Sequence, residues 1–248
     1  MASNDNLSAG EQGPGEPEAR PLQIGSLLFE GLDQIDLTGP FEVLSRLPGA
    51  TCRLYAKSLS PVLDVRGLRL LPDAAIAEAP QLDVLHVPGG FGQGALMDDH
   101  ETLFWIAQQA RGARYVFSVC TGALLCGAAG LLEGKRATTH WSAHRLLPYF
   151  GAIAVGERVV IDGNLVSTAG VTAGIDGALR LAALLRGDDT ARAIQLYMQY
   201  APEPPFDSGS PDRAPANVLA GVRHTFEAIT LQREATARRV AQRLGIAV

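Results

Sequence analysis

The sequence predicts one α/β domain, built on a mostly parallel, twisted sheet with helices on both faces. Three observations support this fold class. Short apolar runs alternate along the chain with longer segments of helical spacing, which is the order that a parallel sheet requires. The 248 residues are 47% hydrophobic and 19% charged, enough for one large buried core. No internal repeat divides the chain.

The first elements follow from the pattern of apolar residues. Leu22–Phe29 is a continuous apolar run, typical of a strand buried on both faces. Residues 36–49 open with turn residues and continue with helical spacing, so we expect a helix there. Residues 51–58 alternate polar and apolar side chains and predict a second strand. Residues 61–73 predict a hairpin or edge ribbon with Gly67 near its turn.

The middle of the chain continues the alternation of strand and helix. Residues 82–90 predict a buried strand that ends in a Gly-Gly turn. Residues 101–112 predict an amphipathic helix, and we expect Phe104 and Trp105 on its apolar side to lie in the core.

The second half of the chain predicts seven further elements. They are a short strand, a helix, a hairpin that turns at Asp162-Gly163, two helices, a Pro-rich loop and a charged C-terminal helix. In that order they cover residues 135–141, 142–151, 152–170, 171–187, 188–200, 201–216 and 217–244.

Composition excludes several classes of protein. Residues 1–21 are rich in Gly, Pro, Glu, Ser and Asn, so we expect a disordered leader, followed by one domain over 22–248. No apolar run is long enough to span a membrane, and the leader lacks the apolar core of a secretory signal. The net charge of −5 comes without a basic stripe, which argues against nucleic acid as a partner. Three widely spaced cysteines form no disulfide framework, so a cytoplasmic protein is expected.

Cys120 is the first candidate for chemistry. The apolar run 114–119 precedes it and the helical segment 121–132 follows at once, which is the layout of a nucleophile elbow. Gly122 leaves room for the sharp turn, and the start of a helix favours a thiolate by lowering the cysteine pKa. The alternative is a small buried hydrophobic residue, the role that we assign to Cys52 and Cys126.

Two other segments place polar groups at the ends of predicted strands. The carboxyl ends of parallel strands meet at one edge of a sheet, so we expect Asp36, Gly89-Gly90 and Cys120 to converge. Asp36 either acts as an acid–base group or caps a helix. Backbone N–H groups at Gly90 and its neighbours are candidates to receive developing negative charge. Thr121 either hydrogen-bonds Asp36 and orients it, or caps its own helix.

Two further patterns predict neither a cofactor nor a metal. The glycine-rich run at 89–94 resembles a dinucleotide fingerprint, but no acidic residue ends a strand about 20 residues on, as ribose binding requires. His140 and His144 are spaced i, i+4 but have no evident third ligand, so no metal site is expected. We expect His140 and Trp141 to line the pocket or to pack beneath it.

Five motifs together carry a resemblance to a known family. "DLTGP", "VPGG", "SVCTG", "ATTHW" and "TAGID" resemble the PfpI-type superfamily, which has a flavodoxin-like, class I glutamine amidotransferase-like fold. The resemblance runs from Leu22 to the end of the chain. Within that superfamily the motifs are most similar to those of the isonitrile-hydrating enzymes.

This resemblance implies a reaction and its residues. It implies a homodimer without a cofactor that adds water to a small organic isonitrile, giving an N-substituted formamide. Cys120 aligns with the nucleophile that forms a thioimidate, and Asp36 with the acid–base residue. Thr121 stands where protease-like relatives carry His, and Asp36 where many relatives carry Glu; both differences argue against a protease or a glyoxalase.

Two alternatives to an isonitrile hydratase remain open. One is a related cysteine hydrolase or a glyoxalase-like enzyme. The other is a ligand-sensing domain, because the fold also resembles the sensor half of AraC-type transcription regulators. The absence of a basic DNA-binding helical pair in this sequence counts against a regulator.

Overall fold

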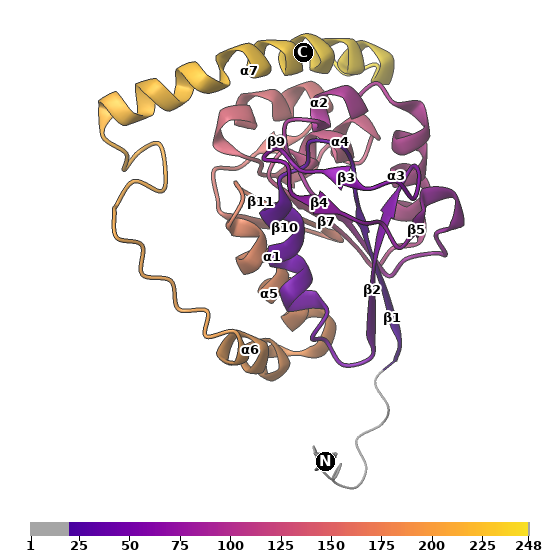
Figure 1. The fold of residues 1–248 in the computed structure, drawn as a ribbon. Coiled ribbons are helices and arrows are strands. Elements are labelled where there is room, and N and C mark those ends of the chain that lie inside the picture. Colours follow the sequence, from indigo (N-terminus) through magenta and orange to yellow (C-terminus); the bar gives the residue numbers. More distant parts are fainter. Residues whose placement is uncertain (1–19, 248) are drawn as a thin grey trace, which may run out of the picture.

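A mostly parallel sheet forms the centre of the computed structural model, which describes residues 20–247 (Figure 1). Its seven strands run in the order β10-β11-β7-β6-β1-β2-β5. All neighbouring strands pair in parallel except β10 and β11. The strands are β1 (Leu22–Leu27), β2 (Ala50–Ala56), β5 (Ala74–Ala75), β6 (Val84–Val87), β7 (Tyr115–Val119), β10 (Val159–Asp162) and β11 (Leu165–Thr168).

Helices cover both faces of this sheet, and each face has its own buried cluster. One face packs against α1 (Gln34–Leu44), α5 (Ala173–Arg186) and α6 (Asp188–Tyr197). The other packs against α3 (His100–Gly112), α4 (Gly122–Ala128) and the 3₁₀ helix η2 (Trp141–Phe150).

The longest helix, α7 (Ala216–Leu244), lies on η2 and on the short helix α2 (Gln93–Leu96). Figure 1 shows α7 across the top of the molecule, connected to α6 at the bottom by an extended segment along one side. Residues 201–215 form this segment. The chain therefore returns, after the sheet is complete, to the region of α2 and η2.

Short elements complete the fold. The strands β3 (Val62–Leu63) and β4 (Arg69–Leu70) form the predicted hairpin, with Gly67 at a φ of +92° in its turn. The strands β8 (Arg136–Ala137) and β9 (Ile153–Ala154) pair in parallel, and η1 (Ile76–Glu78) is a single 3₁₀ turn.

The predicted fold class is confirmed, with local differences. Residues 1–19 of the predicted leader lie outside the described residues. The helix expected over 142–151 is a 3₁₀ helix that contains Pro148. The turn of the β10–β11 hairpin lies at residues 163–164, one residue beyond the expected position, because Asp162 still pairs with Leu165. Trp105 is buried, but Phe104 is 67% exposed, so its assignment to the core was wrong: α3 turns that position toward solvent.

The start of α1 also differs from the expectation. The helix begins at Gln34, and Asp33 is its N-cap, accepting a hydrogen bond from the Ile35 N–H at 3.2 Å. Asp36 therefore lies inside the first turn and is not the cap. The Asp36 carboxyl is left free for another purpose.

Candidate active site

Cys120 lies on a strained turn between β7 and α4. Its φ is +56°, a backbone conformation that residues other than glycine rarely adopt. A Cβ at Gly122 would lie 2.0 Å from the Val87 carbonyl oxygen, so only glycine permits this turn. The Cys120 N–H donates to the Ala169 carbonyl oxygen at 3.0 Å, and the Thr139 hydroxyl donates to the Cys120 carbonyl oxygen at 2.7 Å. These contacts fix the elbow from both sides.

Asp36 is fully buried beside this elbow. Its Oδ2 accepts a hydrogen bond from the Gly89 N–H at 2.9 Å. Its Oδ1 is buried without a hydrogen-bond partner among the described residues. Burial, and then the charge of Asp33, raise the pKa of Asp36 to about 8. The side chain is therefore largely a neutral acid at pH 7, able to donate a proton.

The Cys120 thiol neighbours Asp36, and each affects the other's pKa, although no hydrogen bond of standard geometry joins them. Burial, and then the Asp36 charge, raise the pKa of Cys120 well above its usual range. The N–H groups of Val171 and Thr121 act in the opposite direction. The expected resting thiolate was wrong, because desolvation outweighs the start of the helix.

Gly89 and Gly90 hold the site in place through their backbones. The Gly89 N–H is directed at Asp36, and the Gly90 N–H donates to the Thr121 hydroxyl oxygen at 3.1 Å. Because both N–H groups are occupied, they are not available to a developing negative charge, which corrects that expectation. The N–H groups of Val171 and Thr121 face Cys120 instead.

Thr121 plays neither role that we expected of it. Among the described residues, its hydroxyl makes no cap hydrogen bond to α4 and none with Asp36. It exchanges hydrogen bonds with the backbone of Gly90, at 3.1 Å from the N–H and 3.3 Å to the carbonyl oxygen. It therefore ties the elbow to the glycine turn after β6. Three neighbouring strands, β7, β6 and β1, thus bring Cys120, Gly89 and Asp36 together at their carboxyl ends, as expected.

A small cavity of about 60 Å³ opens onto Cys120. Its walls combine apolar side chains with four groups that carry or titrate charge. The lining residues are Asp33, Val65, Gly90, Phe91, Cys120, Thr121, His140, Val171, Phe226 and Arg233.

An aromatic cluster forms one wall of this cavity. Phe226 of α7 packs against Phe91, His140 and Trp141, with ring centroids 5.9, 5.4 and 5.8 Å apart. His140 lines the cavity, while Trp141 lies behind it, against His140 and Phe226. Burial, and then the charge of Arg233, lower the pKa of His140 to about 4, so its imidazole is neutral at pH 7.

Arg233 is a residue of the cavity that sequence reasoning missed. It is 2% exposed, and its Nη2 donates to the Gly90 carbonyl oxygen at 2.7 Å. The sequence holds one signal that we did not use. Arg233 lies on the same face of the helix as the buried Ala237 and Val240. A charged residue on a buried helix face is unusual, so its position in the pattern indicates a specific role.

Another missed group is His86 on β6, which is fully buried next to the site. Its Nδ1 lies 2.9 Å from the Ser26 hydroxyl oxygen, and its ring stacks on Phe117. Burial lowers its pKa to about 3. It is a neutral packing group on a central strand of the sheet.

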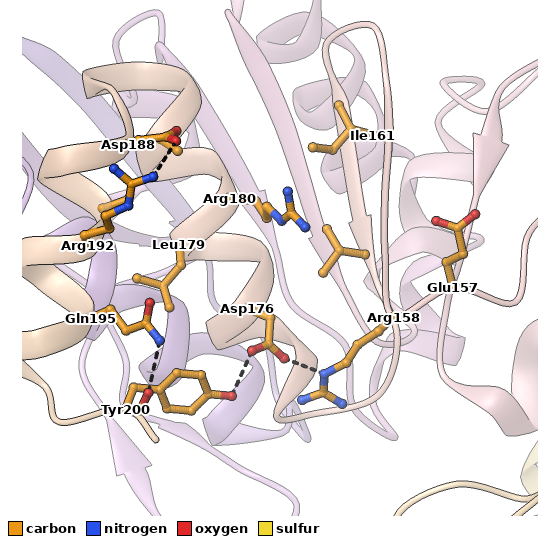
Figure 2. A pocket seen from close by; sticks show the side chains of 13 residues that line it. Glu157, Arg158, Ile161, Asp176, Leu179, Arg180, Asp188, Arg192, Gln195 and Tyr200 are labelled. Carbon is orange, nitrogen blue, oxygen red and sulfur yellow. Dashed lines mark hydrogen bonds and ion pairs between the residues drawn. The ribbon is translucent and has the colours of Figure 1, made fainter. Parts of the chain in front are cut away.

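A larger cavity, of about 930 Å³, lies elsewhere, between β10 and the helices α5 and α6. Figure 2 shows two ion pairs among its charged groups: Arg158 with Asp176, and Arg192 with Asp188. The Tyr200 hydroxyl donates to Asp176 at 2.9 Å. This cavity contains none of the predicted site residues and no cysteine, so we do not assign the chemistry to it.

The two histidines at 140 and 144 do not act together. His140 Nδ1 lies 2.8 Å from the Ser142 hydroxyl oxygen, whereas His144 Nε2 lies 3.0 Å from the Val155 carbonyl oxygen. Within residues 20–247, no three His, Cys, Asp or Glu side chains form a group suited to a metal ion. Among the helices described, none combines the length and apolarity needed to cross a membrane.

The fold and the site define an α/β protein with a cysteine at an elbow and a buried carboxyl beside it, at the carboxyl edge of a parallel sheet. Residues 23–184 match the model of the DJ-1/PfpI family, and the chain belongs to that family.

Three relatives show how far the similarity extends. An isonitrile hydratase from Pseudomonas putida is 54% identical over 89% of this chain and 97% of its own length. The crystal structure of a THiJ/PfpI family protein from Pseudomonas syringae, 40% identical, superposes with a TM-score of 0.89 over 95% of this chain and 99% of that one. The HTH-type transcriptional regulator GbdR from Pseudomonas aeruginosa is 32% identical over 75% of this chain, which spans about half of that regulator's length (53%).

Proposed function

We propose that this chain is an isonitrile hydratase that uses Cys120 as nucleophile and Asp36 as acid–base group. The similarity to the Pseudomonas putida enzyme over almost the whole of both chains supports the reaction. The structural observation that carries the assignment is the buried pair itself: a thiol on a strained elbow beside a carboxyl whose free oxygen has no other partner.

In the first step the thiol adds across the terminal carbon of the isonitrile. The Cys120 sulfur forms a bond to that carbon and loses its proton to Asp36, while Asp36 delivers one proton to the same carbon. The product is a thioimidate in which the carbon carries one hydrogen, one sulfur and a double bond to nitrogen. No electrons are gained or lost overall, so the step needs no redox cofactor.

In the second step water replaces the sulfur. The Asp36 acid gives its proton to the nitrogen and accepts one from water as the water oxygen attacks the thioimidate carbon. The carbon–sulfur bond then breaks, the remaining hydroxyl proton of the intermediate passes to the Cys120 sulfur, and the N-substituted formamide leaves. Asp36 ends in its starting state, because it accepts and returns one proton in each step.

The cavity suits an uncharged substrate. Apolar surface around Cys120 comes from Val65, Phe91, Val171 and Phe226. An isonitrile carries no net charge, so an apolar pocket is suited to bind it. The volume of about 60 Å³ holds the isonitrile group and little more, since one water fills about 30 Å³ of liquid. The organic substituent then extends past the two phenylalanines.

Turnover of a para-nitrophenyl or cyclohexyl isonitrile to its formamide tests this proposal. We expect product with the wild-type protein and none above background with Cys120→Ser. Cys52→Ser is the matched control, because Cys52 lies on β2 and does not line the cavity. Full activity of Cys120→Ser would reject the nucleophile, and intact mass should show a trapped adduct only on proteins that retain Cys120.

The similarity to the regulator favours one second candidate, a domain that binds a small ligand in the same cavity without converting it. Under that candidate an isonitrile or a related molecule would bind without forming a formamide. A thermal shift with ligand and no turnover would support it, and turnover would reject it. Turnover of methylglyoxal would instead support a glyoxalase-like enzyme.

We also propose that the protein is a cytoplasmic homodimer. Large apolar side chains are exposed on α6, on the segment 201–215 and on α7: Leu196, Tyr197, Phe206, Val218 and Leu231. A second copy would cover this surface. Three free cysteines fit a reducing compartment. Sedimentation equilibrium should give twice the chain mass, and a monomer at micromolar concentration would reject the dimer.

A further inference from the structure

Arg233 is a buried cation in the cavity of Cys120, and the reaction steps above do not use it. It comes from α7, which lies outside the residues 23–184 that match the family model. One of its nitrogens donates to the Gly90 carbonyl oxygen, while its Nε is buried without a hydrogen-bond partner among the described residues. A buried guanidinium without a carboxylate partner is costly, so its position calls for a functional explanation.

We propose that Arg233 supplies the positive charge that stabilises the Cys120 thiolate as it attacks the substrate. The two side chains line the same cavity of about 60 Å³. Their positions are fixed by one chain of contacts: Arg233 donates to the Gly90 carbonyl oxygen, and Gly90 exchanges hydrogen bonds with Thr121, the residue after Cys120. The inference rests on the proposed function, since it explains how the nucleophile of that reaction becomes ionised.

The charges around Cys120 make such a partner necessary. Burial opposes the thiolate, and an ionised Asp36 would repel it. The raised pKa of Asp36 keeps that carboxyl largely neutral at pH 7, and His140 is neutral as well. Asp33, half-buried at the cap of α1, is the remaining acid of the cavity. Arg233 is then the cation that offsets the thiolate, and the Cys120 charge in turn raises the pKa of Arg233, which burial lowers.

The rate of Cys120 alkylation by iodoacetamide against pH measures this effect without any isonitrile. Peptide mapping isolates Cys120 from Cys52 and Cys126. Arg233→Gln keeps a donor for the Gly90 carbonyl oxygen but removes the charge, and Arg233→Lys keeps the charge. We expect the glutamine variant to raise the apparent pKa of alkylation by about one unit or more and to slow the reaction about tenfold at pH 7. The lysine variant should retain the wild-type profile.

Arg243→Gln is the matched control, because Arg243 also lies on α7 and donates to a backbone carbonyl oxygen, that of Ala128, at 3.0 Å, but does not line the cavity. It should leave the profile unchanged. The proposal fails when Arg233→Gln leaves the pH profile of alkylation unchanged, or when Arg233→Lys and Arg233→Gln slow alkylation equally. It also fails when Arg243→Gln slows alkylation as much as Arg233→Gln does.

A second measurement needs no variant, in case Arg233→Gln does not fold. Anionic iodoacetate and neutral iodoacetamide are compared as alkylating agents. The ratio of their rates, iodoacetate over iodoacetamide, should be higher for Cys120 in the wild-type protein than for free N-acetylcysteinamide, because Arg233 attracts the anion. An equal or lower ratio contradicts the proposal. Charge effects on Cys120 without isonitrile turnover would reject the proposed function and leave only the electrostatic effect of Arg233 on the Cys120 thiolate.

Discussion

The backbone N–H of Gly89 donates to Oδ2 of Asp36 at 2.9 Å, and the other carboxyl oxygen has no hydrogen-bond partner among the described residues. One oxygen thus positions the side chain and the other is free to carry a proton. Asp36→Asn keeps an oxygen for the Gly89 N–H but cannot exchange a proton. We therefore expect folding to persist and kcat to fall at least about a hundredfold, the usual contribution of a general acid–base group.

Circular dichroism and steady-state turnover of a para-nitrophenyl isonitrile check this expectation together. Asp83→Asn is the control, since Asp83 also accepts a backbone N–H, that of Gln23 at 2.9 Å, at the opposite end of β1. Wild-type turnover by Asp36→Asn would remove Asp36 from the mechanism.

The same substitution should change how stability depends on pH. The folded-state pKa of Asp36, about 8, lies above its unfolded value near 3.8. The folded state therefore binds more protons between these values, and this contribution to stability is complete below pH 4 and is lost as pH rises to about 8. Asp36→Asn cannot titrate, so it removes this decrease in stability with rising pH. Its free energy of unfolding, relative to wild type, should increase from pH 5 to pH 8, by at most about 1.4 kcal/mol per pH unit.

Urea denaturation at four pH values measures this difference. A difference that stays constant from pH 5 to pH 8 would show that Asp36 is ionised throughout.

The elbow itself should be intolerant of a methyl group at Gly122. A Cβ there would lie 2.0 Å from the Val87 carbonyl oxygen, which belongs to a central strand and cannot move freely. We expect Gly122→Ala to destabilise the protein by about 1–3 kcal/mol and to lower activity by displacing Cys120. Gly156→Ala, where a Cβ meets nothing within 4 Å, is the matched control. Equal unfolding midpoints for the two variants would contradict the elbow geometry.

Thr121 should act through its hydroxyl. Thr121→Val leaves the buried Gly90 N–H without its acceptor, which costs about 1–3 kcal/mol, and loosens the turn that Arg233 contacts. Thr121→Ser retains the hydroxyl and should stay close to wild type in stability and kcat. Thermal denaturation and turnover of both variants decide the point, and a valine variant as active and stable as the serine variant would show that the hydrogen bonds contribute nothing.

Phe226 should limit the size of the substrate. It forms part of a cavity of only about 60 Å³, so Phe226→Ala should enlarge it toward α7. We expect kcat/KM for a bulky isonitrile to rise relative to that for a small linear one. Phe206→Ala, at a side chain 79% exposed outside the cavity, should leave the ratio unchanged. The same kcat/KM ratio in Phe226→Ala as in wild type would show that the organic substituent of the isonitrile does not contact Phe226.

The sequence predicted the parts of this protein that depend on local patterns. The alternation of apolar runs and helical segments gave the sheet and its helices, and a cysteine between a strand and a helix gave the position of the elbow. The convergence of Asp36, Gly89 and Cys120 followed from the rule for carboxyl ends of parallel strands.

Features that depend on contacts between distant segments were not predictable in this way. Arg233 meets Gly90 across 143 positions of the chain, and several other arginines on the same helix gave no reason to select it. The pKa of Cys120 depends on the depth of its burial, which no local pattern reveals. The hydrogen bonds that occupy Gly89 and Gly90 likewise depend on α1 and α4 being in place.

The order of elements along the chain has a consequence for biosynthesis. α7 supplies Phe226 and Arg233, yet it is made after every strand of the sheet. A ribosome-bound nascent chain can therefore complete its sheet while the sulfur of Cys120 still lacks the wall that later shields it. Docking of α7 then closes the cavity around Cys120.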